Sequence, residues 1–263
     1  MKIILFSKRE LLIKSFLIII IVLFIMSVLL YFQNSKALTI EASSDSECDE
    51  FVGKIQNLTK GTEKIAYLTF DDGPTEAATP KILDILKEED VKASFFVIGK
   101  YVSAHPEIVK RAYEEGHYIA NHGYDHNNSN MYKSMASFRE EVEKTDAEIG
   151  KTIGVEGYSA KVFRFPNGYM SSVYKGKKKE AAKILSEMGY AYIDWNCLNN
   201  DSVKKYTSAQ LLNNLKKSAK NKDTLVILMH DTKDVSDSSE VLKDSIEYLK
   251  SQGYEFRNFY DLM

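Results

Sequence analysis

The sequence predicts an α/β fold in which a parallel sheet curls into an incomplete βα barrel. Seven short apolar runs typical of strands alternate with amphipathic runs typical of helices, as in a series of βαβ units. Asp and His residues directly follow or end several of the strand-like runs. Because parallel βα barrels carry their chemistry at the carboxyl ends of the strands, these positions mark the candidate site.

The predicted strands are rich in β-branched and aromatic residues and end near turn residues. They span residues 64–70, 92–98, 117–121, 161–165, 190–195, 224–230 and 254–256. Start and stop signals place three helices, with Pro80 at the first turn of 79–87 and with Gly116 and Gly189 after 106–115 and 178–188. Apolar periodicity predicts three more, at 138–152, 208–220 and 239–251.

The start of the chain differs in composition from the rest. Residues 1–14 carry a net charge of +3, and residues 15–32 are eighteen uncharged, mainly apolar residues. As a helix this run would span about 27 Å, close to the roughly 30 Å of a bilayer core. The basic flank predicts a cytoplasmic N-terminus and a single transmembrane anchor, with the rest of the chain outside the cell. A cleaved signal peptide is the alternative, because small residues stand at Ser35 and Ala37.

The remaining composition describes a stalk and one globular domain. Residues 33–63 are polar and rich in Ser, Asp and Glu, which is typical of an extracellular stalk, and residues 64–263 follow as a domain. The net charge of −2 argues against a nucleic-acid partner. Two cysteines, Cys48 and Cys197, exclude a Cys-x-x-Cys metal site, and both a disulfide outside the cell and two lone thiols stay open.

Two pairs of polar residues carry the chemistry. Asp71 and Asp72 follow the first strand, and His122 and His126 follow the third. Since side chains alternate across a strand, one carboxylate can bind a metal while its neighbour faces a water molecule. Each pair alone has a plain structural interpretation, as a turn or as loop residues. Together, one Asp and two His as ligands and a second Asp as base predict a metal-assisted hydrolase.

These motifs resemble those of the polysaccharide deacetylase family, carbohydrate esterase family four, which shares the NodB homology domain. Thr69 to Asp72 reads Thr-Phe-Asp-Asp, and His122 to His126 matches His-Ser/Thr-x-x-His except that Gly123 stands in the Ser/Thr place. The resemblance implies a distorted (β/α)7 barrel over residues 64–263, with Asp71 as base. It also implies that Asp72, His122 and His126 bind a divalent metal, Zn²⁺ first, with Co²⁺, Ni²⁺ or Mn²⁺ as alternatives.

Two further motifs extend the resemblance. Arg164 precedes Phe165-Pro166-Asn167-Gly168, and in the family this Arg orients the base while the backbone N–H after the Pro, here that of Asn167, faces the oxyanion. The apolar strand that ends in Leu228-Met229-His230 nominates His230 as the general acid.

The fourth motif departs from the family pattern. Trp195 is followed six residues later by Asp201 and then by Ser202, where the family commonly has a second Trp. We therefore expect Asp201 to hold His230, with Asp194 as the alternative. Tyr124, Pro166 and Trp195 are the candidate substrate-binding residues. The lysines at 175–179 are interpreted as a solvated helix start, with contact to an anionic wall polymer as the alternative.

The resemblance implies hydrolysis of N-acetyl groups on a polymeric aminosugar. An anchored enzyme facing outward meets the cell wall first, so the expected substrate is N-acetylglucosamine of peptidoglycan and the expected state is a monomer. The alternatives are an O-acetyl xylan or glycan esterase, and a deacetylase of chitooligosaccharides or poly-N-acetylglucosamine. A non-catalytic wall-binding protein is an alternative of a different class.

Overall fold

The computed structural model describes residue 26, residues 49–232, residue 235 and residues 237–263. The predicted anchor, apart from Met26, the basic segment 1–14, the stalk up to residue 47 and Cys48 lie outside this part of the chain. Within it, no helix has both the length and the apolar character needed to cross a membrane. Glu50–Met263 form one compact unit.

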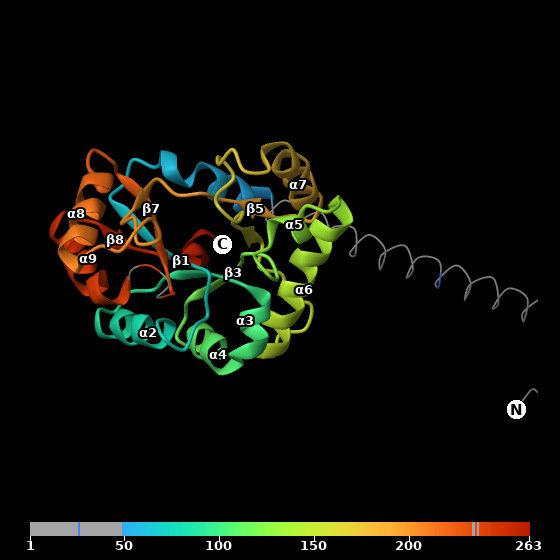
Figure 1. Ribbon diagram of the computed structural model, residues 1–263, viewed down its shortest axis with the longest axis horizontal. Helices are drawn as coiled ribbons and strands as arrows, with labels where there is room; N and C mark the ends of the chain where they lie inside the picture. The colour runs from blue at the N-terminus through green and yellow to red at the C-terminus, as the bar shows by residue number, and fades with distance from the viewer. Residues whose placement is uncertain (1–25, 27–48, 233–234, 236) are drawn as a thin grey trace, which may run out of the picture. The chain divides into compact units, whose positions relative to one another are not determined.

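A parallel, curled sheet forms the centre of this unit, and helices surround it (Figure 1). Its strands are β1 (Ile65–Asp71), β2 (Ser94–Val97), β3 (Tyr118–Asn121), β4 (Val162–Phe163), β5 (Ala191–Tyr192), β6 (Cys197–Leu198), β7 (Thr224–His230) and β8 (Glu255–Phe256). They follow the order β5-β4-β3-β2-β1-β7-β6, with β8 paired to β1. The two ends of this path, β5 and β6, leave the barrel incomplete, as predicted.

All six predicted helices are present, while two short helices between the strands and the helix at residues 49–57 were not predicted. The helices between the strands are α2 (Thr79–Glu88), α3 (Gly99–Ala104), α4 (Pro106–Glu114), α5 (Asn128–Met131), α6 (Met135–Ile153), α7 (Lys175–Glu187), α8 (Ser208–Ala219) and α9 (Ser239–Ser251). Short 3₁₀ helices η1 (Leu58–Lys60) and η2 (Phe259–Leu262) flank them. The unpredicted α3 and α5 have six and four residues, too few to show a helical period.

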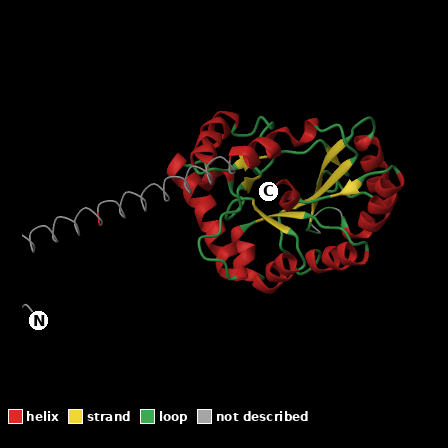
Figure 2. Cartoon of the chain, turned by 180° about the vertical axis from the view of Figure 1, so that it is seen from behind, coloured by secondary structure: helices red, strands yellow, loops and turns green. Residues whose placement is uncertain are grey.

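Alternate residues of β1 supply two separate cores, and a third core in the described structure lies between β4, α6 and α7. Outward residues of β1, such as Leu68 and Phe70, pack beneath the helices. Inward residues such as Tyr67 and Phe96 pack with Phe259 of η2, which lies in the middle of the ring in both views (Figures 1 and 2). Side chains therefore fill the barrel interior.

The inner core also corrects the predicted start of the domain. Residues 49–57 are helical, and Phe51, Ile55 and Leu58 are buried within the inner core. Their spacing of four and three residues places them on one helix face, which pairs with the open interior of the sheet. The part of the predicted stalk from residue 50 onward thus belongs to the compact unit.

Strand register gathers the predicted site residues at one edge of the sheet. β1 and β7 pair through seven residues, which sets Asp71 beside His230. Asn121, the last residue of β3, lies between Val97 of β2 and Phe163 of β4. The residues that follow these strands therefore meet at the carboxyl edge.

Several predicted strands are shorter than expected, among them β2, β4 and β5, and one strand, β6, was not predicted. Residues 190–195 were expected to form a single strand, but β5 holds only Ala191 and Tyr192. The carbonyls of Ile193 and Asp194 accept hydrogen bonds from the Arg164 side chain (3.1 and 3.2 Å) and are thus diverted from the sheet. The chain pairs again with β7 as β6.

Candidate active site

The predicted metal ligands form one cluster. Asp72 Oδ1 lies 3.4 Å from His122 Nε2 and 3.3 Å from His126 Nε2, and ligand atoms of all three lie within 4.8 Å of one another. A tetrahedral site with bonds of about 2.0–2.1 Å separates neighbouring ligand atoms by about 3.3 Å. Asp72 Oδ1 is buried and has no hydrogen-bond partner in the described part of the chain. The cluster therefore fits a divalent cation.

Left-handed backbone turns aim these side chains. Asp72 and His126 have φ values of 76° and 57°. Gly123 has φ 83°, and a Cβ at this position would come within 2.4 Å of Met131. The Gly123 N–H donates to the Asn121 side chain (2.9 Å), which closes the turn around His122. This conformation explains why glycine replaces the Ser or Thr expected from the motif.

Hydrogen bonding sets the tautomer of His122. Its Nδ1–H donates to the Arg164 carbonyl (2.8 Å), so Nε2 is directed at Asp72. Burial alone would lower the pKa of His122, but the charges of Asp71 and Asp72 raise it. Burial and the charge of His122 lower the pKa of His126. For Asp72, burial is outweighed by the contact with His122 and by the histidine charges, so its pKa lies well below the usual range.

The predicted base is held by a buried arginine. Arg164 has no exposed surface, and its Nη1 donates to Asp71 Oδ1 (2.8 Å) and Thr69 Oγ1 (2.7 Å). Thr69 in turn donates to the Ile227 carbonyl (2.7 Å) on β7. The other Asp71 oxygen lies 3.9 Å from His122 Nε2. The carboxylate is thus fixed on one side and faces the ligand cluster on the other.

The predicted acid is held by Asp201. The His230 Nδ1–H donates to Asp201 Oδ1 (2.7 Å), and the His230 backbone N–H donates to Asp201 Oδ2 (2.8 Å). Burial alone would lower the pKa of His230, but Asp201 first, then Asp71 and Asp72, raise it to about 9. His230 Nε2 points toward Asp72 Oδ2 at 3.9 Å. The predicted Asp201 contact is present, and it favours the protonated form of His230.

Sequence reasoning missed the residues that hold Asp201. The Ser238 hydroxyl donates to Asp201 Oδ2 and accepts from the Asn199 side chain (3.0 Å). Asn199 Oδ1 also accepts the Asp201 backbone N–H (3.0 Å). Both residues lie outside the family motifs, and short polar residues in loops give no signal of their own.

The turn after Arg164 carries the predicted oxyanion donor. Asn167 has φ 64°, its side chain accepts from Asn128 (2.9 Å), and its backbone N–H has no hydrogen-bond partner among the described residues. The Gly168 carbonyl accepts from the Lys178 ammonium (2.5 Å), although burial lowers the Lys178 pKa. Lys178 is fully buried, which corrects the expectation of a solvated lysine stretch for this residue.

The alternative partner of His230 has a different position. Asp194 accepts the backbone N–H groups of Tyr169 (2.7 Å) and Met170 (3.0 Å) through its carboxylate. Asp194 therefore stabilises the C-terminal end of the turn that contains Asn167, and it makes no hydrogen bond to His230 in the described structure.

A family model described as polysaccharide deacetylase matches residues 59–193. The chain belongs to the polysaccharide deacetylase family. The peptidoglycan-N-acetylmuramic acid deacetylase of Bacillus subtilis is 33% identical over 201 residues, covering 76% of this chain and 72% of the relative. A peptidoglycan-N-acetylglucosamine deacetylase of Bacillus cereus is 35% identical over 205 residues, covering 75% and 70%.

Solved structures agree with this assignment. The catalytic domain of a peptidoglycan N-acetylglucosamine deacetylase from Eubacterium rectale has a TM-score of 0.68 at 28% identity, covering 74% of this chain and 88% of that one. The curled parallel half-barrel is therefore the fold of the family. Deacetylases of this family are metal-dependent, and Asp72, His122 and His126 form a cluster that could hold the metal.

The candidate substrate residues of this deacetylase lie in different settings. Trp195 packs against the oxyanion turn, since a Cβ on Gly168 would come within 2.9 Å of its ring. Pro166 is buried in the same turn. Tyr124, by contrast, lies under the Lys144 ammonium at 3.6 Å and lines a hollow along α6. The structure thus brings Trp195 and Pro166 to the turn and places Tyr124 against α6.

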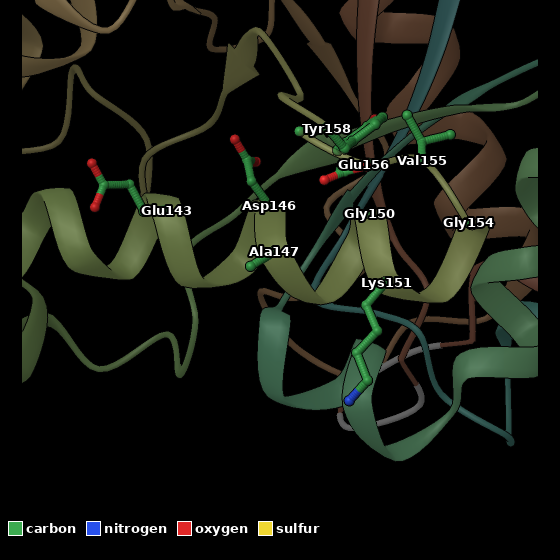
Figure 3. A pocket seen from close by; sticks show the side chains of 10 residues that line it. Glu143, Asp146, Ala147, Gly150, Lys151, Gly154, Val155, Glu156 and Tyr158 are labelled. Carbon is green, nitrogen blue, oxygen red and sulfur yellow. The ribbon is translucent and has the colours of Figure 1, made fainter.

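Two larger cavities lie on the domain. One of about 450 Å³ is lined by Asp72 and His126 and opens beside the metal ligands. The other, of about 610 Å³, lies between α6 and the loop at 154–158, and Figure 3 shows Asp146 and Tyr158 from its lining. None of the predicted site residues lines the second cavity, so only the first belongs to the candidate active site.

Proposed function

We propose that this deacetylase removes N-acetyl groups from peptidoglycan, with N-acetylglucosamine as the substrate sugar and Zn²⁺ as the metal. The proposal depends on the observation that three groups meet at the carboxyl edge of the sheet. They are the ligand cluster, the ion pair of Asp71 with Arg164, and the ion pair of His230 with Asp201. The names of the relatives from Bacillus and Eubacterium support the peptidoglycan substrate.

The geometry gives each residue a step. A divalent cation held by Asp72, His122 and His126 would polarise the acetyl carbonyl and the attacking water. Asp71 removes a proton from that water, and Arg164 keeps the carboxylate in place. The backbone N–H of Asn167 stabilises the oxyanion. As the C–N bond breaks, protonated His230 gives its proton to the leaving amine, and acetate is released.

The location of the enzyme is part of the same proposal. Residues 15–32 anchor the chain as a single transmembrane helix, with residues 1–14 in the cytoplasm and the catalytic domain, as a monomer, facing the wall. Protease added to intact cells should then digest the domain and spare the first residues. Recovery of the protein from the medium, starting near residue 38, would support the signal-peptide alternative.

Acetate release from isolated peptidoglycan by the metal-loaded protein tests the proposed function. Asp71→Asn should keep the metal and lose kcat by about 10²-fold or more, as removal of a general base typically does. The matched control is Asp84→Asn on the exposed side of α2, which should turn over normally.

Two other outcomes would contradict the proposal. Acetate from acetylated xylan but none from peptidoglycan would identify an esterase. Metal and wall binding with no acetate from either polymer would identify a non-catalytic wall-binding protein.

A further inference from the structure

The cavity beside the metal ligands has a wall that the proposed chemistry leaves unused. Asp72 and His126 line one side, and the rest is lined by Thr75, Ala77, Ile98, Lys100, Tyr101, Asp125 and Thr232. Because the cavity shares two residues with the ligand cluster, a sugar whose acetamido group reaches the metal can extend a neighbouring substituent into it. With a volume of about 450 Å³, it has room for one.

Lys100 puts a fixed positive charge in this cavity. Its ammonium donates to the Asp125 carbonyl (3.0 Å) and lies 4.9 Å from the centre of the Tyr101 ring. These two contacts hold the flexible side chain over the cavity. Lysine carries three N–H donors, so further donors stay available after the bond to Asp125.

The charge of Lys100 has no acidic partner within the described part of the chain. No carboxylate oxygen there lies within 4.0 Å of its ammonium, unlike Lys110, which pairs with Glu114 at 3.8 Å. The carboxylate of Asp125 accepts the Asn127 backbone N–H and the Asn130 side chain (2.7 Å each), and neither of its oxygens lies within 4.0 Å of the Lys100 ammonium. A cation that is held beside a substrate site, with no carboxylate of the described residues in ion-pair contact, favours an anionic group on the substrate.

We propose that Lys100 binds a carboxylate that the polymer carries next to the reacting sugar, and so makes the enzyme discriminate in favour of charged strands. The inference rests on the proposed function. Peptidoglycan offers such a carboxylate from two sources: the lactyl ether of muramic acid when no peptide is attached, and the stem peptide when one is. Chitin and other polymers of N-acetylglucosamine alone carry none. Lys100 would therefore separate the proposed substrate from the neutral alternatives.

Three glycan tetramers of alternating N-acetylglucosamine and N-acetylmuramic acid test this role. The first has free lactyl carboxylates, the second has them converted to neutral methyl amides, and the third keeps the stem peptides. The wild-type enzyme should show a kcat/KM for acetate release about tenfold higher on a charged tetramer than on the methyl amide, the effect of one charge-assisted contact. Preference for the first or the third tetramer identifies the source of the carboxylate.

Variants at Lys100 assign that preference to the side chain. In Lys100→Met the ratio of kcat/KM between the charged and neutral tetramers should fall toward one, and Lys100→Arg should retain most of it. Lys110→Met removes the same charge from the surface of α4 and should keep the wild-type ratio. This control separates a local contact from a change in net charge.

Other outcomes would overturn the inference. A wild-type ratio in Lys100→Met, or an equal loss of kcat/KM on all three tetramers, would mean that Lys100 only supports the loop at Asp125. Wild-type turnover without any preference would defeat the inference and leave the proposed function standing. Failure to release acetate from all three tetramers would defeat the proposed function and the inference with it.

Discussion

His122 and His230 stand at the carboxyl ends of two strands, and each donates its Nδ1–H to a different kind of acceptor. His122 donates to a neutral carbonyl, that of Arg164, at 2.8 Å. His230 donates to the carboxylate of Asp201 at 2.7 Å. Both pKa values are raised, but by charges on opposite sides of the ring.

This difference supports the two roles proposed for these histidines, metal ligand for His122 and general acid for His230. The charges that raise the His122 pKa face Nε2, where Asp72 Oδ1 is 3.4 Å away, so a bound cation takes the place of the proton there. The charge that most raises the His230 pKa contacts Nδ1 instead. The Nε2–H of His230 therefore stays available to the leaving amine. The acceptor at Nδ1, a carbonyl for His122 and a carboxylate for His230, thus distinguishes the proposed metal ligand from the proposed acid.

Removing a ligand should have the largest effect. His122→Ala or His126→Ala should lose both the metal and acetate release, the latter by at least about 10³-fold, because three protein ligands leave no spare and a metal Lewis acid contributes several kcal/mol. Metal analysis and an acetate assay on the same preparation measure this. His105→Ala, beside the start of α4, is the control and should keep both. One equivalent of metal retained by either variant would remove the ligand assignment.

Neutralising Asp201, which accepts the hydrogen bond from His230, should have the next largest effect. Asp201→Asn should keep the metal, lower the pKa of His230 from about 9 toward its ordinary value, and reduce kcat by about 10²-fold at neutral pH. Since protonated His230 is the active form, activity should fall at a lower pH than in the wild type. The pH profile of kcat from pH 6 to 10 measures this. An unchanged alkaline limb would mean that Asp201 does not set the protonation of His230.

A smaller effect is expected at the turn after Arg164, which carries the proposed oxyanion donor, the backbone N–H of Asn167. Lys178→Met removes the donor to the Gly168 carbonyl, one residue from Asn167, and should reduce kcat by about tenfold with full metal content, as slight misplacement of an oxyanion donor does. Lys179→Met is the matched control, because the side chain of Lys179 is adjacent in sequence but exposed. Equal kcat in the two variants would show that the turn holds without Lys178.

Periodicity and motif spacing suffice to predict most of this architecture. The long strands β1 and β7 and the six longer helices follow from apolar patterns, and the two Asp and two His residues lie together because parallel strands end at one edge. The motif pattern also placed Asp201 rather than Asp194 beside His230. These features depend on local sequence patterns and on the fact that parallel strands end at the same edge of the sheet.

What escaped prediction depends on contacts between distant segments. The helix at 49–57 was taken for a stalk because its apolar residues Phe51 and Ile55 make sense only inside the curled sheet. Lys178 stands on the same helix face as buried Ala181 and Leu185, which was a signal available in the sequence, but the cluster of neighbouring lysines masked it. The bracing by Ser238 has no sequence signal, since it joins loops far apart in the chain.

A third histidine sharpens the comparison, because burial and nearby cations outweigh its carboxylate neighbour, Glu115, whose Oε2 lies 4.0 Å from His117 Nε2. His117 is buried, accepts the Ala93 N–H at Nδ1 (3.1 Å), and has no hydrogen-bond partner at Nε2 in the described part of the chain. Burial first, and then the charges of Lys92 and Arg111, lower its pKa to about 4. The same imidazole thus has a lowered pKa where burial and neighbouring cations dominate over a carboxylate 4.0 Å away.

The smallest expected effect concerns His117 and the pH dependence of the free energy of unfolding. The folded pKa of His117 lies below the unfolded one, so the unfolded state alone takes up a proton as pH falls from 6.5 toward 4, and stability is lost over that window. The loss should be about 1 kcal/mol at pH 5.5. His117→Asn keeps an acceptor for Ala93 without titrating, so its loss in free energy of unfolding between pH 7.5 and 5.5 should be smaller by that amount. Urea unfolding at both pH values measures the difference, and equal losses in the variant and the wild type would show that His117 is not held neutral by burial.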